Sequence, residues 1–254
     1  MRGVTEWTRS SAAAAAAELA GRSAEVILSW SLTAFPADRL ILASSFGPED
    51  VVLIDMFGVL GRFPRVVTLD TGRLPQETHD VVDRIRAKYA LKLETYCPDA
   101  ARVSEIVDRH GPNLFYESVE LRRLCCRARK VEPLRRALAG GQAWITGLRR
   151  EQSPSRAAAA LIEWDEEFGL VKLNPLAIWT AEDVWRRIRD RGLPYNRLHD
   201  AGYPSVGCAP CSRAVMPGDD PRSGRWWWEN PAAARECGLH RAKESTGAAR
   251  GGDS

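Results

Sequence analysis

Short apolar runs alternate with longer amphipathic stretches along most of the chain. Apolar runs bounded by turn residues predict buried strands, whereas apolar positions three and four residues apart predict helices. The expected strands span 39–43, 65–69, 91–96 and 142–146, and the expected helices span 12–34, 51–60, 76–89, 100–109, 131–138 and 181–191. Residues 161–165 and 170–173 are expected to form a hairpin. This alternation predicts an α/β fold with a doubly wound, mostly parallel sheet.

Three polar loops directly follow expected strands. They are Ser44–Asp50, Asp70–Pro75 and Gly147–Arg156. A strand, a turn of small residues and a helix N-terminus together form an anion site, because backbone N–H groups and the helix dipole face the ligand. The carboxyl ends of parallel strands share one edge of the sheet, so we expect the three loops to converge on a ligand there.

The regular pattern fades after Tyr195. We therefore expect two parts, an α/β domain over 1–215 and a flexible, irregular C-terminal tail over 216–254. Three consecutive tryptophans, Trp226–Trp228, fall in the tail, and we expect them to anchor it to the body rather than to bind a base.

Charge and composition narrow the ligand and the compartment. The net charge is only +3, but Arg supplies 31 of the 36 basic residues, and its guanidinium forks onto phosphate and sulfate oxygens. A small anionic substrate is thus favoured over a long nucleic acid, although genomic base composition also enriches Arg. No apolar run approaches the roughly 20 residues of a membrane span, and Ala12–Ala17 lacks the bulky apolar core of a signal peptide. We expect a cytosolic protein, in which six cysteines indicate metal or redox chemistry rather than disulfides.

Four of the cysteines form a split set. Cys125 and Cys126 are adjacent, and after 81 intervening residues Cys208 and Cys211 form a C-x-x-C pair. Four thiolates suit zinc, copper(I) or an iron-sulfur cluster. Zinc sites draw each ligand pair from a C-x(2 to 4)-C turn, which the tandem pair does not match, so a cluster is favoured over zinc. Two unrelated buried cysteine pairs are the plainer alternative. In a helical reading Lys130 lies one turn after Cys126, beside the thiolates.

The tail carries one further cysteine of interest, Cys237. Charged residues, a glycine and His240 flank it in a segment that is too polar for the core. Exposed cysteines with basic neighbours are the reactive ones, because the thiolate is the nucleophile. Cys237 is therefore a candidate nucleophile, with an incidental surface cysteine as the alternative.

Several motifs in a fixed order give the chain a family resemblance. They read S-S-F-G-P-E-D-V-V-L, L-D-T-G-R-L, C-C-R-A-R-K, W-I-T-G-L-R-R-E-Q-S-P-S-R, P-Y-N-R-L-H-D-A-G-Y-P-S-V-G-C-A-P-C, R-S-G-R-W-W-W-E and E-C-G-L-H. From about Leu40 to His240 the chain resembles the assimilatory adenylylsulfate (APS) reductases, relatives of the phosphoadenylylsulfate (PAPS) reductases. The resemblance implies a fold related to the adenine-nucleotide alpha hydrolases and PP-loop ATP pyrophosphatases. The pyrophosphatase loop reads S-G-G-x-D-S, whereas the loop from Ser44 to Val51 lacks the Gly-Gly pair and ends in Val rather than Ser, which fits binding an adenylyl ester without cleaving ATP.

The resemblance also implies residue roles. Lining the adenosine side would be Ser44, Ser45, Leu69 and Gly147, and surrounding the phosphosulfate would be Lys130, Arg156, Arg222, Arg225 and His240. A [4Fe–4S] cluster would be held by Cys125, Cys126, Cys208 and Cys211. Position 46 is Phe where some members carry a small polar residue, and Cys97 matches no ligand of the family. For Arg149 and Arg150 a ligand role and a solvated loop charge are both open.

The implied activity is reduction of APS to sulfite and AMP through an S-sulfocysteine at Cys237, with a thioredoxin-like dithiol as reductant. Neither a nucleic-acid nor a membrane partner is expected, and a homo-oligomer is possible. A PAPS or dual-specificity reductase is the nearest alternative; relatives specific for PAPS generally lack the four cysteines. An ATP-dependent tRNA-thiolating enzyme would keep S-G-G-x-D-S and add an RNA-binding module, and neither is visible. A non-enzymatic, cluster-bearing redox sensor would use Cys237 as an oxidation switch.

Overall fold

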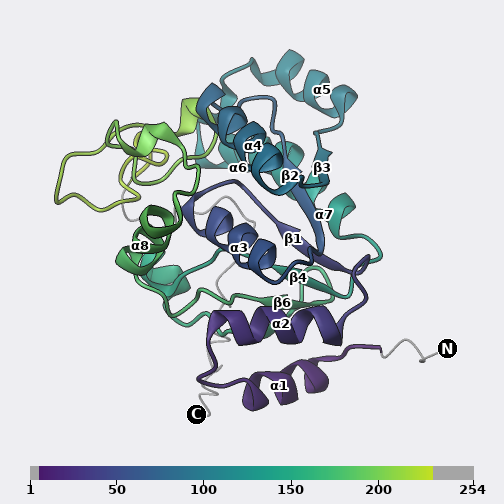
Figure 1. The fold of residues 1–254 in the computed structure, drawn as a ribbon. Helices are drawn as coiled ribbons and strands as arrows, with labels where there is room; N and C mark the ends of the chain where they lie inside the picture. The colour runs from purple at the N-terminus through teal and green to yellow at the C-terminus, as the bar shows by residue number, and fades with distance from the viewer. Residues whose placement is uncertain (1–5, 231–254) are drawn as a thin grey trace, which may run out of the picture.

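A six-stranded sheet forms the centre of the protein (Figure 1). The computed structural model describes residues 6–230. The strand order is β3-β2-β1-β4-β6-β5, and every neighbouring pair is parallel except β5 with β6. The strands are β1 (Leu40–Ala43), β2 (Arg65–Leu69), β3 (Leu93–Tyr96), β4 (Ala143–Ile145), β5 (Ile162–Asp165) and β6 (Leu170–Leu173). The sequence prediction of an α/β, mostly parallel sheet with a terminal hairpin is confirmed.

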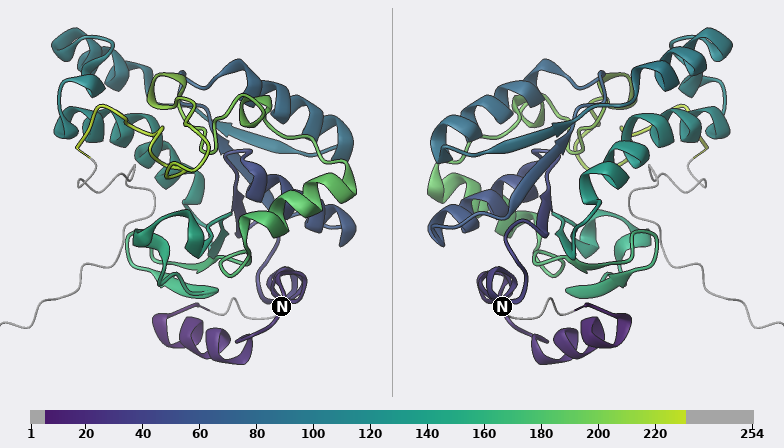
Figure 2. Two further views of the ribbon diagram at one scale, coloured as in Figure 1. Left: turned by 90° about the vertical axis from the view of Figure 1, so that its left-hand side faces the viewer. Right: turned by 90° about the vertical axis from the view of Figure 1, so that its right-hand side faces the viewer.

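Helices cover both faces of the sheet (Figure 2). Alternate residues of β1 show why: Leu40 and Leu42 enter the core shared with α2, α3 and α4, whereas Ile41 enters the core that α7 covers. Successive side chains of a strand point to opposite faces, so an uninterrupted apolar strand requires cover on both. The α-helices are α1 (Arg9–Glu18), α2 (Ala24–Ala34), α3 (Pro48–Val59), α4 (Gln76–Tyr89), α5 (Ala100–His110), α6 (Val119–Cys126), α7 (Glu132–Leu138) and α8 (Ala181–Arg191).

The topology places a binding edge beside β1. From β1 the chain runs through α3 to β2 and through α4 to β3, and it then returns through α5–α7 to β4, on the other side of β1. The strand order therefore reverses between β1 and β4. In open parallel sheets ligands bind outside the carboxyl ends of the strands at such a reversal.

The prediction of one helix near the N-terminus is wrong. The single helix predicted over 12–34 is two helices, α1 and α2, separated at Gly21, which has φ +72°. The Ser23 hydroxyl accepts a hydrogen bond from the Val26 N–H and caps α2. The Ala-rich composition continues the helical propensity across this break, so propensity alone concealed the turn and the cap that follow it.

A second local difference occurs at the tandem cysteines. A helical reading of C-C-R-A-R-K places Lys130 one α-helical turn after Cys126, but α6 ends at Cys126 and a π-helix covers Arg127–Val131 before α7 begins. A π-turn inside a helix is rare and is frequently found at functional sites.

A buried carboxylate fastens α8 to the body. Asp55 on α3 accepts from Arg187 Nη2 at 3.0 Å, from Arg191 Nη2 at 3.2 Å and from the Tyr89 hydroxyl at 2.9 Å. Burial opposes ionisation, but these hydrogen bonds and charges outweigh it and lower the pKa of Asp55. α8 is thereby held against α3, where it forms one wall of the pocket described below.

Within residues 6–230, no helix is both long enough and apolar enough to cross a membrane.

Candidate active site

A large pocket opens at the carboxyl ends of β1, β2 and β4. The three polar loops predicted to converge all contribute to its lining, as do α8 and the segment after Tyr195. The described residues that the resemblance assigned to substrate all line it: Ser44, Ser45, Leu69, Lys130, Gly147, Arg156, Arg222 and Arg225. Cys237 and His240, and most of the tail predicted over 216–254, lie outside the described residues, so that domain division stays a prediction.

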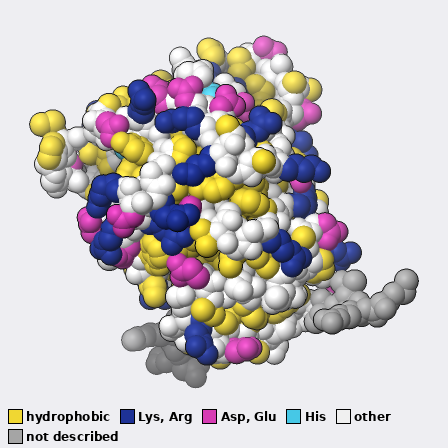
Figure 3. All heavy atoms as spheres, viewed as in Figure 1, with side chains coloured by type: hydrophobic (Ala, Val, Ile, Leu, Met, Phe, Trp, Pro, Cys, Tyr) yellow, Lys and Arg dark blue, Asp and Glu magenta, His cyan; other side chains and the backbone are white. Residues whose placement is uncertain are grey.

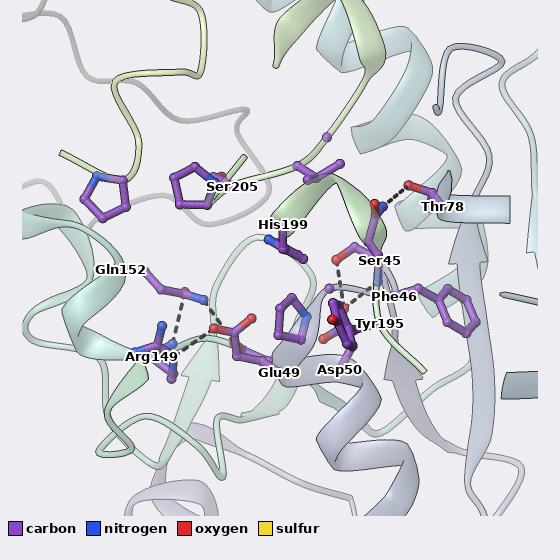
Figure 4. Close-up of a pocket in the computed structure, with 18 of the residues that line it drawn as sticks. Ser45, Phe46, Glu49, Asp50, Thr78, Arg149, Gln152, Tyr195, His199 and Ser205 are labelled. Carbon is purple, nitrogen blue, oxygen red and sulfur yellow. Dashed lines mark hydrogen bonds and ion pairs between the residues drawn. The ribbon is translucent and has the colours of Figure 1, made fainter. Parts of the chain in front are cut away.

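The loop after β1 is closed by a carboxylate. Asp50 Oδ2 accepts from the Ser45 N–H at 2.6 Å and from the Ser45 hydroxyl at 2.8 Å (Figure 4). Burial raises the pKa of Asp50 to about 6, although the bonds from Ser45 act in the opposite direction. Phe46, at φ 57°, turns its ring into the core with 1% exposed. Phe46, which stands where some family members carry a small polar residue, thus packs in the core from a left-handed backbone turn.

The loop after β4 lies tightly against the start of α3. A Cβ at Gly147 would lie 2.8 Å from Glu49 Cβ and closer still to Asp50 Oδ1, so only glycine fits. Arg149 is 8% exposed and its Nε donates to Glu49 Oε1 at 2.8 Å. Arg150 is exposed, and its Nε donates to the Ala159 carbonyl at 2.8 Å. The alternative of a solvated loop charge therefore fails for Arg149, which is buried in an ion pair.

The four cysteines of the split set line one small cavity beside this pocket. Cys126, Cys208 and Cys211 are buried and Cys125 is half-buried, and none of the described cysteines forms a disulfide. A backbone hydrogen bond holds the segment around Cys208 beside the loop after β2. In it the Ala209 N–H donates to the Arg73 carbonyl at 2.8 Å. Cys97 is exposed and does not line the cavity. Folding thus brings together the two halves that the sequence separates.

Basic side chains surround the cysteine cavity. Lys130 and Arg225 line both this cavity and the large pocket. Burial opposes ionisation of Cys208, but the charge of Lys130 and a 3.3 Å contact with the Thr71 hydroxyl lower the pKa of its thiol. Burial raises the pKa of Cys211 to about 11 and also raises that of Cys125. A bound cation would favour the thiolate form of these cysteines further.

The donor set meets the chemical requirement of an iron-sulfur cluster. Its four side chains are all sulfur donors, and they face one cavity with cations around it. Within residues 6–230, no three His, Cys, Asp or Glu side chains are placed so that they could hold a single metal ion. Cys125, Cys126, Cys208 and Cys211 would hold such a cluster, each supplying one thiolate ligand.

A buried tryptophan joins the tail segment to the cysteine region. Trp226 is 1% exposed, and the guanidinium carbons of Arg122 and Arg225 lie 4.6 Å and 4.9 Å from the centroid of its ring. Trp228 Nε1 donates to the Phe115 carbonyl at 3.0 Å. The predicted anchoring role of Trp226–Trp228 is confirmed for these two residues. Arg225, assigned to substrate, also donates from Nε to the Cys211 carbonyl at 3.0 Å.

Part of the pocket wall was not assigned from sequence. Thr78, Asn196 and His199 line it, with Asn196 Nδ2 donating to Thr78 Oγ1 at 3.1 Å and the His199 ring packed edge-on against Trp185 at 5.2 Å. Burial lowers the pKa of His199. The motif P-Y-N-R-L-H-D contained two of these residues, but nothing in its spacing indicates which of its side chains turn inward.

Lys and Arg are not gathered into one patch on the face seen in Figure 3, where Asp and Glu side chains are interspersed with them. A continuous basic stripe is the expected footprint of a nucleic-acid binder. No such continuous stripe is visible on this face.

Comparisons with known proteins give the family. Residues 39–214 match the model of the phosphoadenosine phosphosulfate reductase domain. Adenosine 5'-phosphosulfate reductase of Allochromatium vinosum is 51% identical over 205 residues, covering 80% of this chain and 79% of that protein. The enzyme of the same name from Burkholderia cepacia is 49% identical over 203 residues, covering 80% of this chain and 81% of that protein.

Solved structures agree with the fold. The crystal structure of PAPS reductase from Candida auris, a phosphate complex, superposes with a TM-score of 0.70 at 29% identity, covering 84% of this chain and all of that one. FMN adenylyltransferase from Candida glabrata reaches a TM-score of 0.55 at 12% identity, covering 89% of this chain and 76% of that chain, and shows likeness of fold alone. The family model matches more than half of the chain and the bacterial relatives cover about four fifths of it, so the chain belongs to the APS/PAPS reductase family.

Proposed function

We propose that the protein reduces adenylylsulfate to sulfite and AMP, in the assimilation of sulfate. The observation that carries the proposal is the pocket itself. It joins the loop of Ser44 and Ser45 to Lys130, Arg156 and further arginines, in a chain about half identical to enzymes named adenosine 5'-phosphosulfate reductase. The loop of Ser44 and Ser45 suits a nucleoside and its phosphate, and the Lys and Arg side chains suit a phosphosulfate.

The proposed chemistry is transfer of the sulfuryl group to a thiolate. Cys237 Sγ attacks the sulfur of APS, the bond between that sulfur and the bridging oxygen breaks, and AMP leaves with the oxygen and its electron pair. Negative charge grows on the departing phosphate, so fixed Lys and Arg groups stabilise the transition state. Dividing the reduction into two steps is the advantage of a covalent intermediate.

A dithiol protein of the thioredoxin class completes the proposed cycle. One of its thiolates attacks Cys237 Sγ, which releases sulfite and forms a mixed disulfide. Its second thiol then displaces Cys237 as a free thiol, and the dithiol leaves oxidised. The two electrons that reduce the sulfuryl group therefore come from the partner, and the enzyme returns to its starting state.

We infer further that Cys125, Cys126, Cys208 and Cys211 hold a [4Fe–4S] cluster. Support comes from the all-sulfur donor set around one cavity and the cations that line it. When bound, the cluster would add charge next to Lys130, which also lines the substrate pocket. Lys130 would thus bind the sulfate end of the substrate from a position that the cysteines fix.

The decisive experiment follows turnover and the adduct separately. Anaerobic kinetics with APS and with PAPS, each with reduced thioredoxin, should show turnover of APS and much slower turnover of PAPS; equal rates would support the dual-specificity alternative. Mass spectrometry after APS alone should show a sulfonate on Cys237, and Cys237→Ser should abolish sulfite release. Unchanged turnover in Cys237→Ser would overturn the covalent role of Cys237, whereas no sulfite release from the protein with native Cys237 would support the redox-sensor alternative.

A further inference from the structure

One glutamine contacts both ends of the loop that follows β4. Gln152 Oε1 accepts from the Arg149 N–H at 3.1 Å and also from Arg156 Nη1. Its Nε2 donates to the Gly147 carbonyl across a longer 3.5 Å contact. An amide side chain supplies an acceptor and a donor on separate atoms without carrying charge. Gln152 lines the pocket, and no role was assigned to it above.

The same loop is fixed to the body on two sides. Arg149 pairs with Glu49 at the start of α3, with 9% and 15% of the two side chains exposed. Arg149 Nη1 donates to Glu151 Oε2 at 3.1 Å, and that oxygen accepts from the Ala181 N–H, at the start of α8, at 3.1 Å. Figure 4 shows Gln152, Arg149 and Glu49 side by side along one wall of the pocket. The loop segment that carries Gln152 is therefore held in place by contacts with α3 and α8.

We propose that Gln152 is a positioning residue that holds the Arg156 guanidinium at the anionic end of the pocket while it secures Gly147 at the nucleoside end. This inference rests on the proposed function, which assigns Arg156 to the phosphosulfate and Gly147 to the nucleoside. An arginine side chain is flexible, and ordering it before the substrate arrives removes part of the entropic cost of binding. Gln152 supplies that ordering without touching the reacting atoms.

The neutral charge of Gln152 is essential to this role. A glutamate at 152 would keep the acceptor atoms that hold Arg156, but its carboxylate would form an ion pair with the guanidinium. The pair would weaken the attraction of Arg156 for an incoming dianion. Gln152→Ala and Gln152→Glu therefore damage binding for different reasons, the first by releasing Arg156 and the second by neutralising it.

The test is a double-mutant cycle on ligand affinity, read by calorimetry. All proteins carry the full chain with Cys237→Ser, so that bound APS is not consumed. Gln152→Ala should weaken APS binding about tenfold when Arg156 is present, the size expected for a hydrogen bond to a charged group. In an Arg156→Ala background the same change should cost less than about twofold, because Arg156 is already gone and, of the two groups that Gln152 positions, only Gly147 remains, held by the longer 3.5 Å contact.

Matched variants make the outcome clear. Arg150→Ala, on an exposed neighbour whose side chain is not part of the pocket wall, should leave APS affinity unchanged. Gln152→Glu, which preserves the acceptor contacts, should also weaken APS binding and serves if Gln152→Ala folds poorly. Equal losses in both Arg156 backgrounds, or no loss in either, would overturn the inference while leaving the proposed function intact. If the protein with native Gln152 and Arg156 binds neither APS nor AMP, the proposed function itself fails.

Discussion

Arg122 and Glu229 form a bidentate ion pair in the interior, with Nε–Oε1 at 2.7 Å and Nη2–Oε2 at 2.9 Å. Their side chains are 0% and 2% exposed, and Arg122 also lies over the Trp226 ring. The pair joins α6, which ends in the tandem cysteines, to the last described residues before Cys237. A charge pair this deep fixes the segment's position, because neither partner can be left alone without a large penalty.

Removal of one partner of this pair should therefore be costly. We expect Glu229→Ala to lower the free energy of unfolding by about 3–5 kcal/mol, because Arg122 stays buried without its carboxylate. Urea denaturation followed by tryptophan fluorescence measures the change. The exposed Arg102–Glu105 pair offers a control, and Glu105→Ala should cost less than about 1 kcal/mol. Comparable losses in the two variants would contradict this account, whereas Arg122→Met with Glu229→Leu should restore most of the stability.

The Asp55 carboxylate should be similarly important for α8. Asp55→Asn removes the charge that Arg187 and Arg191 share, and we expect it to destabilise the fold by about 3 kcal/mol at pH 7. Because folding lowers the pKa of Asp55, its stabilisation is present above the unfolded pKa of about 4 and is lost as the pH falls below it. The gap between wild type and variant should narrow in acid when unfolding is measured across pH. Glu182→Gln, in an exposed pair with Arg189, should show neither effect.

Asp50 should give the opposite pH dependence. Folding raises its pKa from 3.8 to about 6, so the protonated form is favoured in the native state. Its stabilising contribution is complete below the unfolded pKa and is lost as the pH rises through about 6. Asp50→Asn should therefore gain about 3 kcal/mol of stability relative to wild type between pH 4 and pH 8, the equivalent of two pKa units. Parallel stability curves for the two proteins would show that Asp50 titrates normally.

The cysteine cavity predicts which thiols retain iron. Cys126→Ser and Cys208→Ser should each lose most of the iron and the visible absorbance of the anaerobically purified protein, because a cluster needs all four ligands. They should also unfold at lower denaturant concentration, since binding the group contributes to folding. Cys97→Ser, at an exposed site outside the cavity, should keep both. Full iron content in Cys126→Ser would argue against the assigned ligand set.

Local patterns predicted most of the elements well. The bounds of β2, α4 and α8 agree with the sequence prediction, and Thr180 caps α8 through a capping box with Asp183. These elements depend on periodicity and on neighbouring capping residues, which are local properties. The break at Gly21 and the π-helix after Cys126 were missed. Both are changes in backbone path within segments of helical composition, where propensity gives little discrimination.

The sequence by itself determined the order of the strands and of most helices, the loops that meet at the strand ends, and the motifs that name the family. Only the tertiary structure decided that Arg149 pairs with Glu49, 100 residues away, and that Arg122 pairs with Glu229, 107 residues away. It also decided that Gln152 contacts Arg156 and that the four cysteines face one cavity. A polar side chain meets a distant partner only when the packing of helices and crossover connections brings the two together. Burial then makes each correct pairing valuable and each missing one costly.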